Sequence, residues 1–458
     1  MNRLSLTNLP VAPAVDPRAL SVGIVHLGIG AFHRAHQAVV TERAAVETGD
    51  TRWGIAGVSQ RSTTVRDQLA PQDGLYSVLE RGLGEPSIQV IGSVREVLTV
   101  PEDPEAVVAR MADPAVSVVT LTVTEKGYRA AGDGLNLADP EIQADLTGRP
   151  PRTVVGQLAA AIARRDEPLT ILSCDNLVSN GPFLRQLVTD YFDALGKLPP
   201  AFEATRFPAG MVDRIVPATT DADRDEAARM LGVRDEAVVV AEPFLQWVIE
   251  DDFAGARPAW ERGGAVLTAD VAPWEQAKLR MLNATHSMLA YLGALRGYET
   301  IAEAVRDDEL GALARQLMTD DVVPTLTPPD GLDLTAYGAS VLERFENPAL
   351  KHRTRQVAMD GSVKLPVRML GTVRDRLAAG AEPRIISLAV AAWMVYVSKT
   401  PDIDDPQADR LQAAVAGVSE PAKLVDALLA VDSIFTPDLR DSAAFRDLLI
   451  DHAAALLA

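Results

Sequence analysis

The chain has 458 residues, of which 47% are hydrophobic and 23% charged, and its formal net charge is −19. This is the balance of a packed globular protein with more than one core, and the acidic charge disfavours a nucleic-acid-binding or basic membrane-binding surface. The single cysteine, Cys174, excludes an intrachain disulfide and a thiolate-rich metal site. Because residues 1–17 lack a signal-peptide pattern and no run of 18 apolar residues occurs, we expect a cytoplasmic protein without a membrane span.

The first half of the chain alternates short apolar runs with longer helical patterns. The strand candidates are residues 22–27, 54–59, 116–123 and 169–173. The β-branched density of the third run indicates a strand that is buried on both faces. Helical patterns at about 34–48 and 153–165 lie between these runs. Strands separated by helices form parallel βαβ units, so we predict an α/β domain of the Rossmann type, with a parallel-core sheet, at residues 1–268.

The second half of the chain changes to long helical patterns with few strand signals between them. The helix candidates are residues 275–295, 302–318, 334–345, 385–398 and 442–457. The boundary is expected near Gly263–Asp270, where two glycines and the run Ala-Asp-Val-Ala-Pro lie between the patterned segments. We therefore predict an all-helical domain, which carries the substrate-binding and catalytic residues, at residues 269–458.

Gly28 and Gly30 follow the first predicted strand and precede a helix. Gly28 permits a tight turn, and Gly30 lets backbone amides approach a pyrophosphate at the positive end of the helix. The third glycine of the usual dinucleotide-binding motif is missing, and a simple strand-to-helix turn explains a lone Gly-x-Gly equally well. The position after the first strand of a βαβ series favours the dinucleotide site.

The end of the second predicted strand bears on the identity of the dinucleotide. A carboxylate at this position binds the ribose 2′-hydroxyl of NAD, but no acidic residue occurs here before Asp67. Arg61 and Arg66 are close by, which keeps NADP open. The alternative is that both arginines are solvated surface charges.

Glu275, Lys278, Asn283 and His286 share one face of a predicted helix, within an arc of about 140° at about 100° per residue. An axial rise of about 1.5 Å per residue puts Asn283 and His286 roughly 4.5 Å apart, with Lys278 about 7.5 Å before Asn283. Alcohol oxidation needs a base for the hydroxyl proton and donors for the developing alkoxide. A lysine in apolar surroundings can be that base, and the amide and imidazole can donate. The alternative is the polar face of an amphipathic helix.

A metal site is not expected in this chain. One helical histidine without a nearby cysteine or second histidine is a poor zinc set. His33 and His36 have i, i+3 spacing, but they lie in the nucleotide turn, where metal ligands are not expected.

Seven motifs, in order along nearly the whole chain, resemble those of the mannitol dehydrogenase family of polyol-specific long-chain dehydrogenases. They lie at residues 26–37, 121–128, 173–176, 207–217, 242–251, 278–286 and 359–366. The resemblance is strongest to the fructuronate reductase (mannonate oxidoreductase) branch. It implies a metal-independent, NAD(P)-dependent enzyme that interconverts a secondary alcohol and the C2 ketone of a linear sugar acid or polyol, and it suggests a monomer.

The resemblance also implies roles for individual residues. Lys278 is implied as the general base, Asn176 and Asn283 as an oxyanion hole, and Glu275 as the proton path between Lys278 and solvent. The expected substrate-binding residues are His286, Asp213, Lys364, Lys126 and Arg355. The expected cofactor-binding residues are Gly28, Gly30, Phe32, Arg34, Arg61 and Thr124. Asn176 also follows a predicted parallel strand, at the sheet edge where ligands bind.

Two departures from the family pattern concern the substrate. Mannitol-oxidising members carry an arginine eight residues before the position of Lys364; this chain has Gln356 there, with Arg355 adjacent. Lys126 stands where polyol-oxidising members tend to carry glycine, and a lysine can pair with a substrate carboxylate. D-Mannonate and D-fructuronate are therefore the first expectation, and D-mannitol with D-fructose, or a related pentitol pair, is the alternative. A non-catalytic NAD-binding sensor is the alternative of another class.

Overall fold

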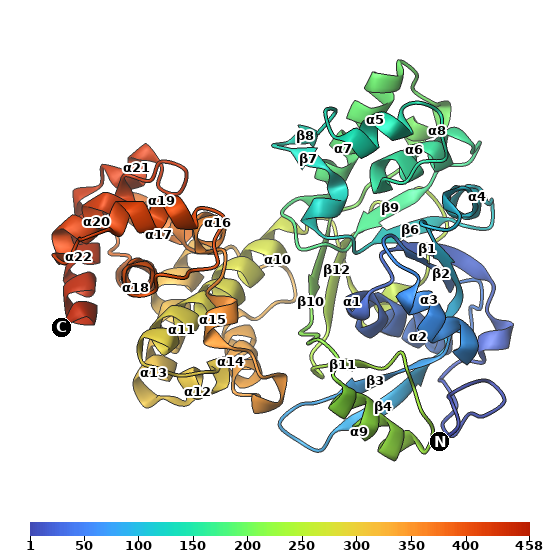
Figure 1. The fold of residues 1–458 in the computed structure, drawn as a ribbon, viewed down its shortest axis with the longest axis horizontal. Coiled ribbons are helices and arrows are strands. Elements are labelled where there is room, and N and C mark those ends of the chain that lie inside the picture. Colours follow the sequence, from blue (N-terminus) through green and yellow to red (C-terminus); the bar gives the residue numbers. More distant parts are fainter. The chain divides into compact units, whose positions relative to one another are not determined.

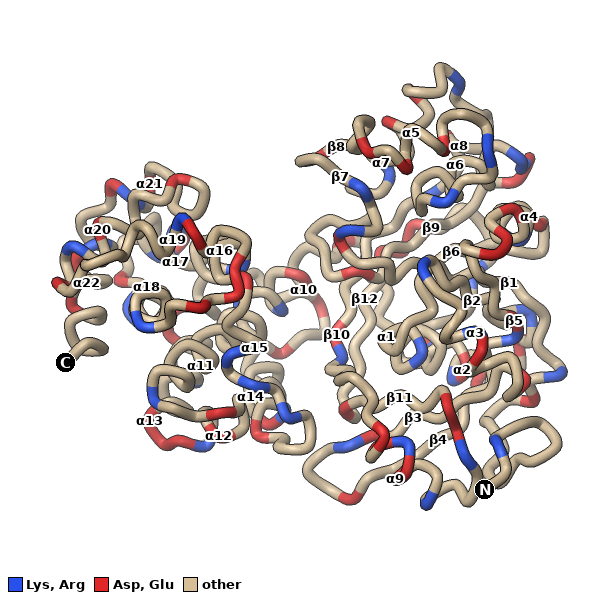
Figure 2. The backbone as a smooth tube through the Cα atoms, viewed as in Figure 1, with Lys and Arg blue, Asp and Glu red and all other residues tan.

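A computed structural model describes all 458 residues, and they form two compact units, Met1–Val271 and Ala272–Ala458 (Figure 1). We call these the N-terminal unit and the C-terminal unit and describe each by itself. Acidic and basic residues alternate along both units, so that the net charge of −19 is not gathered in one segment (Figure 2). No helix in the chain has the length and apolar character needed to cross a membrane.

A five-stranded parallel sheet forms the centre of the N-terminal unit. Its order is β5 (Val94–Thr99), β2 (Gly54–Ser59), β1 (Val22–Leu27), β6 (Val118–Leu121) and β9 (Thr170–Ser173). The Rossmann-type sheet expected from the sequence is thus confirmed, and the third predicted run is trimmed from 116–123 to β6. The edge strand β5 was missed because its sequence, Val-Arg-Glu-Val-Leu-Thr, is only half-buried and lacks a continuous apolar run.

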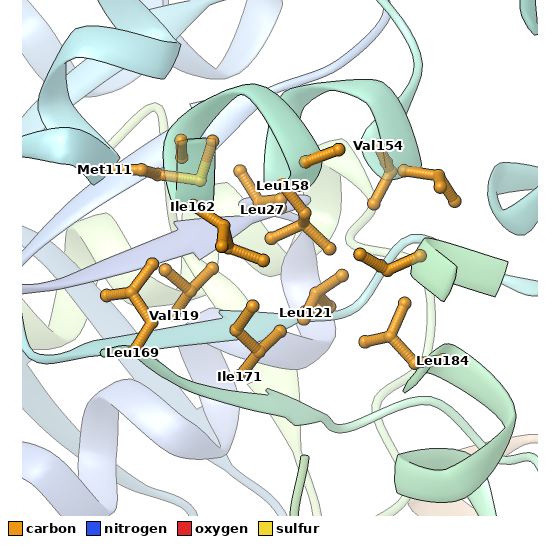
Figure 3. Packing of buried hydrophobic residues seen from close by; sticks show 14 of the residues in the cluster. Leu27, Met111, Val119, Leu121, Val154, Leu158, Ile162, Leu169, Ile171 and Leu184 are labelled. Carbon is orange, nitrogen blue, oxygen red and sulfur yellow. The ribbon is translucent and has the colours of Figure 1, made fainter. Parts of the chain in front are cut away.

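Both faces of this sheet are covered by apolar side chains, as the β-branched runs predicted. In β1, Val25 and Leu27 belong to one hydrophobic cluster while Ile24 belongs to the other. The first cluster includes helix residues such as Leu158 and Leu184, which pack over Val119, Leu121 and Ile171 (Figure 3). This two-sided burial fixes the strands rigidly, so that the turns at their carboxyl ends have defined positions.

The helices of the N-terminal unit connect the strands and cover the sheet. They are α1 (Ala31–Ala35), α2 (Gln37–Thr48), α3 (Thr64–Leu69), α4 (Pro104–Ala112), α5 (Pro140–Asp145), α6 (Val154–Ala163), α7 (Asn180–Leu195), α8 (Pro200–Ala204) and α9 (Asp221–Leu231). The helix predicted at about 34–48 begins earlier and is interrupted at His36, whose φ of −125° and ψ of −89° are not helical. This break separates the glycine turn and α1 from the longer helix.

Three smaller sheets complete the N-terminal unit, and the sequence analysis predicted none of them. They are β10 (Gly210–Asp213) with β12 (Gln246–Glu250) and β13 (Val266–Thr268); β11 (Val239–Ala241) with β3 (Tyr76–Glu80) and β4 (Ser87–Ile91); and β7 (Ala130–Ala131) with β8 (Gly134–Leu135). All of these strands have only two to five residues, too few for a clear alternating pattern.

The C-terminal unit is helical, as predicted. Its α-helices are α10 (Ala272–Ala277), α11 (Ala284–Leu295), α12 (Ile301–Arg306), α13 (Asp308–Gln316), α14 (Leu334–Phe345), α15 (Thr354–Val357), α16 (Gly361–Leu365), α17 (Gly371–Ala378), α18 (Arg384–Lys399), α19 (Ala408–Val415), α20 (Pro421–Leu429), α21 (Pro437–Arg440) and α22 (Ala443–Leu457). The predicted helix 302–318 is divided because Asp307 caps the start of α13 with its side chain. Segments of π-helix lie at η5 (Lys278–Asn283), η6 (Leu317–Val322) and η9 (Pro366–Leu370).

Candidate active site

The turn after β1 requires glycine at one of its two glycine positions. Gly28 has φ of +98°, and a Cβ there would lie 2.2 Å from the carbonyl oxygen of Thr122, so only glycine fits. A Cβ at Gly30 would meet nothing closer than 3.8 Å, so the missing side chain leaves open space above the backbone. The third glycine position holds His33, which is buried and stacks on His26 with ring centroids 3.4 Å apart. The motif therefore lacks its third glycine because a buried histidine, which packs in the interior, occupies that position.

A cavity of about 480 Å³ opens beside this turn. Of the residues predicted from the sequence, it is lined by Gly28, Gly30, Arg61, Thr124 and Lys126. It is also lined by Gln60, Arg152 and Thr153, which the sequence analysis missed. Their only sequence signal is the Thr153 N-cap of α6, because their approach to the turn is created by the order of the strands.

Phe32 and Arg34 do not line this cavity. The Arg34 guanidinium donates to the backbone carbonyls of Gly30 and Ala237 and lies 5.6 Å from the centre of the Tyr76 ring. The Phe32 ring stacks on His36 at 5.0 Å. Arg34 thus stabilises the glycine turn through the Gly30 carbonyl, and Phe32 packs on His36, two residues after Arg34.

After β2, the structure distinguishes the two arginines that the sequence offered as cofactor-binding candidates. Arg66 is held by Asp67 and Glu102 in ion pairs of 2.7 and 2.5 Å. Arg61 is exposed, lines the cavity and has no ion-pair partner. Glu141 also lines the cavity, but it is paired with Arg129. Arg61 is therefore the charged residue at this strand end that is available to a ribose or its phosphate.

The ends of β6 and β9 meet at a second hollow of about 310 Å³, lined by Thr124, Glu125, Lys126, Asp175, Asn176 and Leu177. Asn176, predicted for the oxyanion hole, and Lys126, predicted for the substrate, therefore share one hollow. Lys126 lines this hollow and also the 480 Å³ cavity beside the glycine turn, which we call the cofactor cavity because it is the candidate site for the dinucleotide. Asp213, the last residue of β10, is buried and pairs in register with Gln246 of β12.

The catalytic face predicted at residues 275–286 is not a regular α-helix. Lys278 and Asn283 are the first and last residues of the π-helical segment η5, and both side chains are only 7% exposed. The wider π turn changes the angles between side chains, so the arc calculated at 100° per residue is wrong for this segment. Short π-helical insertions occur frequently at functional sites, where they redirect side chains. Glu275 precedes η5 in α10 and is also buried.

His286, in the first turn of α11, lies in a stack of rings. Its imidazole is 4.8 Å from the Phe345 ring and 5.5 Å from that of His352. Burial, followed by the nearby His352, Arg368, Lys364 and Arg344, holds the pKa of His286 well below its usual value. The imidazole is therefore neutral at neutral pH and can donate from one nitrogen and accept at the other.

The two remaining predicted residues have different surroundings. Lys364 in α16 donates its ammonium to the carbonyls of Met359 and Val357, at 2.5 and 3.3 Å. Burial, and then the neighbouring Arg368, lowers the pKa of Lys364. Arg355 is exposed, 3.7 Å from Asp402, and lines a hollow with the last residues of α11, at the opposite end of that helix from His286. No cluster of three or more His, Cys, Asp or Glu side chains suited to a metal ion occurs.

The glycine turn and the parallel sheet around it are those of a Rossmann-type dinucleotide-binding domain. The chain belongs to the mannitol dehydrogenase family. The family model described as the mannitol dehydrogenase Rossmann domain matches residues 22–262, and that of the mannitol dehydrogenase C-terminal domain matches residues 270–456. Its relatives are dehydrogenases that act on CH–OH groups, so the chain is an oxidoreductase of this kind.

Individual relatives match over nearly the whole chain. D-mannonate oxidoreductase of Escherichia coli (strain K12) is 43% identical over 459 residues, which cover 96% of this chain and 94% of the relative. Mannitol dehydrogenase DSF1 of Saccharomyces cerevisiae is 37% identical, covering 96% and 90%. The structure of Pseudomonas fluorescens mannitol 2-dehydrogenase, a ternary complex with NAD and D-mannitol, has a TM-score of 0.84 at 35% identity and covers 99% of this chain and 96% of its own. These likenesses support NAD as the cofactor and leave the substrate between two classes.

Proposed function

We propose that this enzyme interconverts D-mannonate and D-fructuronate with NAD as its cofactor. The observation that carries the proposal is the 43% identity with a D-mannonate oxidoreductase over 96% of the chain. Lys126, beside both the cofactor cavity and Asn176, supports it by offering a positive charge to a sugar acid. A cytoplasmic location and a monomeric state, both expected from the sequence, are further predictions of this proposal.

The residues of the chain would divide the work of alcohol oxidation between them. The cavity lined by Gly28, Gly30 and Arg61 would hold NAD, which would supply the acceptor for the hydride of the carbinol carbon. Lys278 takes the hydroxyl proton, while the side-chain amides of Asn176 and Asn283 donate to the developing alkoxide. His286 and Asp213 hold other substrate oxygens, with Lys364 and Arg355 as further substrate-binding candidates, and Glu275 passes the proton to solvent. In ketone reduction Lys278 returns the proton.

D-Mannitol and D-fructose are the second candidate pair, favoured by the likeness to mannitol 2-dehydrogenase in complex with D-mannitol. Steady-state assays of both pairs, and of a pentitol, with NAD and with NADP will decide. We expect kcat/KM to be highest for D-mannonate with NAD. Preferred turnover of D-mannitol would replace the first proposal with the second, and binding of NADH without turnover of any of these would leave only the sensor.

A further inference from the structure

Arg368 is an arginine of the C-terminal unit whose guanidinium forms no ion pair with a carboxylate, although Asp360 lies near enough to act on its charge. It lies on η9, which packs against η5, the segment that contains Lys278 and Asn283. Its Nη1 donates to the Ser287 hydroxyl at 2.9 Å and to the Asn283 carbonyl at 3.4 Å. The side chain is partly buried, and burial lowers the pKa of its guanidinium. Buried arginines are usually paired with a carboxylate, because an unpaired charge away from water is costly.

The hydrogen bonds that Arg368 makes leave most of its donors unused. A guanidinium has five N–H groups in a planar fork, and both bonds here come from Nη1. The groups on Nε and Nη2 have no protein acceptor. This fork matches the two oxygens of a carboxylate, which it binds through two parallel hydrogen bonds. One nitrogen of the guanidinium is thus bonded to the protein, while the edge formed by Nε and Nη2 can bind an anion.

The surroundings of Arg368 also favour an anion. The charged or chargeable groups that act most strongly on the nearby His286 are all basic: His352, Arg368, Lys364 and Arg344. Two acidic groups lie near them: Asp360, whose carboxylate is 3.7 Å from the Lys364 ammonium, and Asp405, which also acts on Lys364. Basic side chains thus surround the histidine that is proposed to hold a substrate oxygen, and among them Arg368 forms no ion pair with a carboxylate.

We propose that Arg368 binds the carboxylate of the sugar-acid substrate and is the residue that selects an acid over a polyol. This inference rests on the proposed function, which needs a site for a carboxylate. Lys126 offers only a single exposed ammonium, whereas Arg368 offers a planar fork that Ser287 and Asn283 already orient. A polyol carries a neutral hydroxymethyl group at that end and would gain much less from the guanidinium.

A purely structural role for Arg368 makes a different prediction. If it only ties η9 to α11 through Ser287, its replacement will lower stability and will weaken acid and polyol substrates alike. The two roles are distinguished by the ratio of kcat/KM for D-mannonate to kcat/KM for D-mannitol, measured on the same variant. This ratio does not depend on how much of the enzyme is folded.

The experiment compares Arg368→Gln and Arg368→Lys with the wild-type enzyme and with Arg374→Gln as a matched control. Arg374 is exposed and bound to Asp438 and Thr436, so its replacement removes the same charge from the adjoining helix α17. Dissociation constants of D-mannonate and D-mannitol are measured by calorimetry on the NADH-loaded enzyme, together with kcat/KM for both.

We expect Arg368→Gln to lower the preference for D-mannonate over D-mannitol by about 10- to 100-fold, the range for a charge-assisted hydrogen-bonded pair. Arg368→Lys should lower this preference by a smaller factor, and Arg374→Gln should leave the preference unchanged. Equal losses for the two ligands in Arg368→Gln would overturn the inference. Failure of the proposed function appears separately, as a wild-type enzyme that does not turn over D-mannonate, and the binding ratio still tests Arg368 in that case.

Discussion

The backbone amide of Thr124 donates to the carboxylate of Asp175 over 2.9 Å, and Thr124 has a φ of +66°, in the left-handed region that residues with a side chain rarely adopt. The same carboxylate accepts from the Val123 amide at 2.9 Å and from the Tyr128 hydroxyl at 2.7 Å. Asp175 thus ties the end of β9 to the strained turn after β6, between the cofactor cavity and Asn176. The strain at Thr124 persists because these hydrogen bonds hold it.

Replacement of Asp175 by alanine should therefore affect both stability and cofactor binding. We expect the free energy of unfolding to fall by about 2–4 kcal/mol, because three donors, two of them buried, lose their acceptor. The KM for NAD should rise, since Thr124 lines the cofactor cavity. Denaturant unfolding and NADH fluorescence titration will measure the two effects. The control is Asp190→Ala, which removes a carboxylate that accepts the Leu135 amide elsewhere; an unchanged KM in Asp175→Ala would contradict the role.

Gly28→Ala tests the glycine turn. The new Cβ would lie 2.2 Å from a backbone oxygen at a φ of +98°, so we expect strong destabilisation and loss of detectable NADH binding. Gly49→Ala is the control, because Gly49 has φ of +71° with nothing within 4 Å of a Cβ. It should cost only about 1–2 kcal/mol for the left-handed conformation. Thermal melts of the two variants should differ clearly, and similar melts would show that the contact with Thr122 is not limiting.

Lys278→Ala tests the proposed base. We expect kcat to fall by about 10²- to 10⁴-fold, the range for the loss of general acid–base catalysis, with little change in the dissociation constant of NADH. Lys423→Ala removes an exposed lysine paired with Glu420 and should leave kcat unchanged. Single-turnover kinetics with a deuterated substrate will show whether the chemical step is slowed. A kcat within a factor of about three of wild type would rule Lys278 out as the base.

Arg61→Asp tests the cofactor preference at the end of β2. A carboxylate there would bind the ribose 2′-hydroxyl and repel a 2′-phosphate, so the ratio of kcat/KM for NAD to that for NADP should rise at least about tenfold. Arg66→Gln should leave the ratio unaltered, because the Arg66 guanidinium is already held by Asp67 and Glu102. No change in the ratio for Arg61→Asp would mean that Arg61 does not reach the ribose.

Glu42 predicts a pH dependence of stability. It accepts hydrogen bonds from the backbone amides of Ala14, Gly92 and Ser93, yet burial raises its pKa to about 7. The folded protein therefore holds this proton more tightly than the unfolded chain, and the contribution is lost as the pH rises from about 4.5 to about 7. Glu42→Gln should flatten the fall in unfolding free energy over this interval, by about 3 kcal/mol in total. Parallel slopes for the two proteins would contradict the raised pKa.

The sequence determined the class of the protein and most of its regular structure. Strands β1 and β2 were predicted to the residue, because continuous apolar runs buried on both faces leave a clear pattern. Lys278, Asn283 and His286 were proposed together because they occur within one motif, and their roles remain predictions. Edge strands such as β5 were missed, because half-buried strands mix charged and apolar residues.

Only the tertiary structure decided which of the candidate side chains are free of protein partners and so available to bind a ligand. Arg61 and Arg66 look alike in the sequence, but ion pairs hold Arg66 while Arg61 lines the cofactor cavity. Arg34 follows the glycine turn directly, yet its guanidinium bonds to backbone carbonyls inside the fold. The role of a charged side chain depends on the partners that distant segments bring to it, and spacing along the chain does not specify those partners.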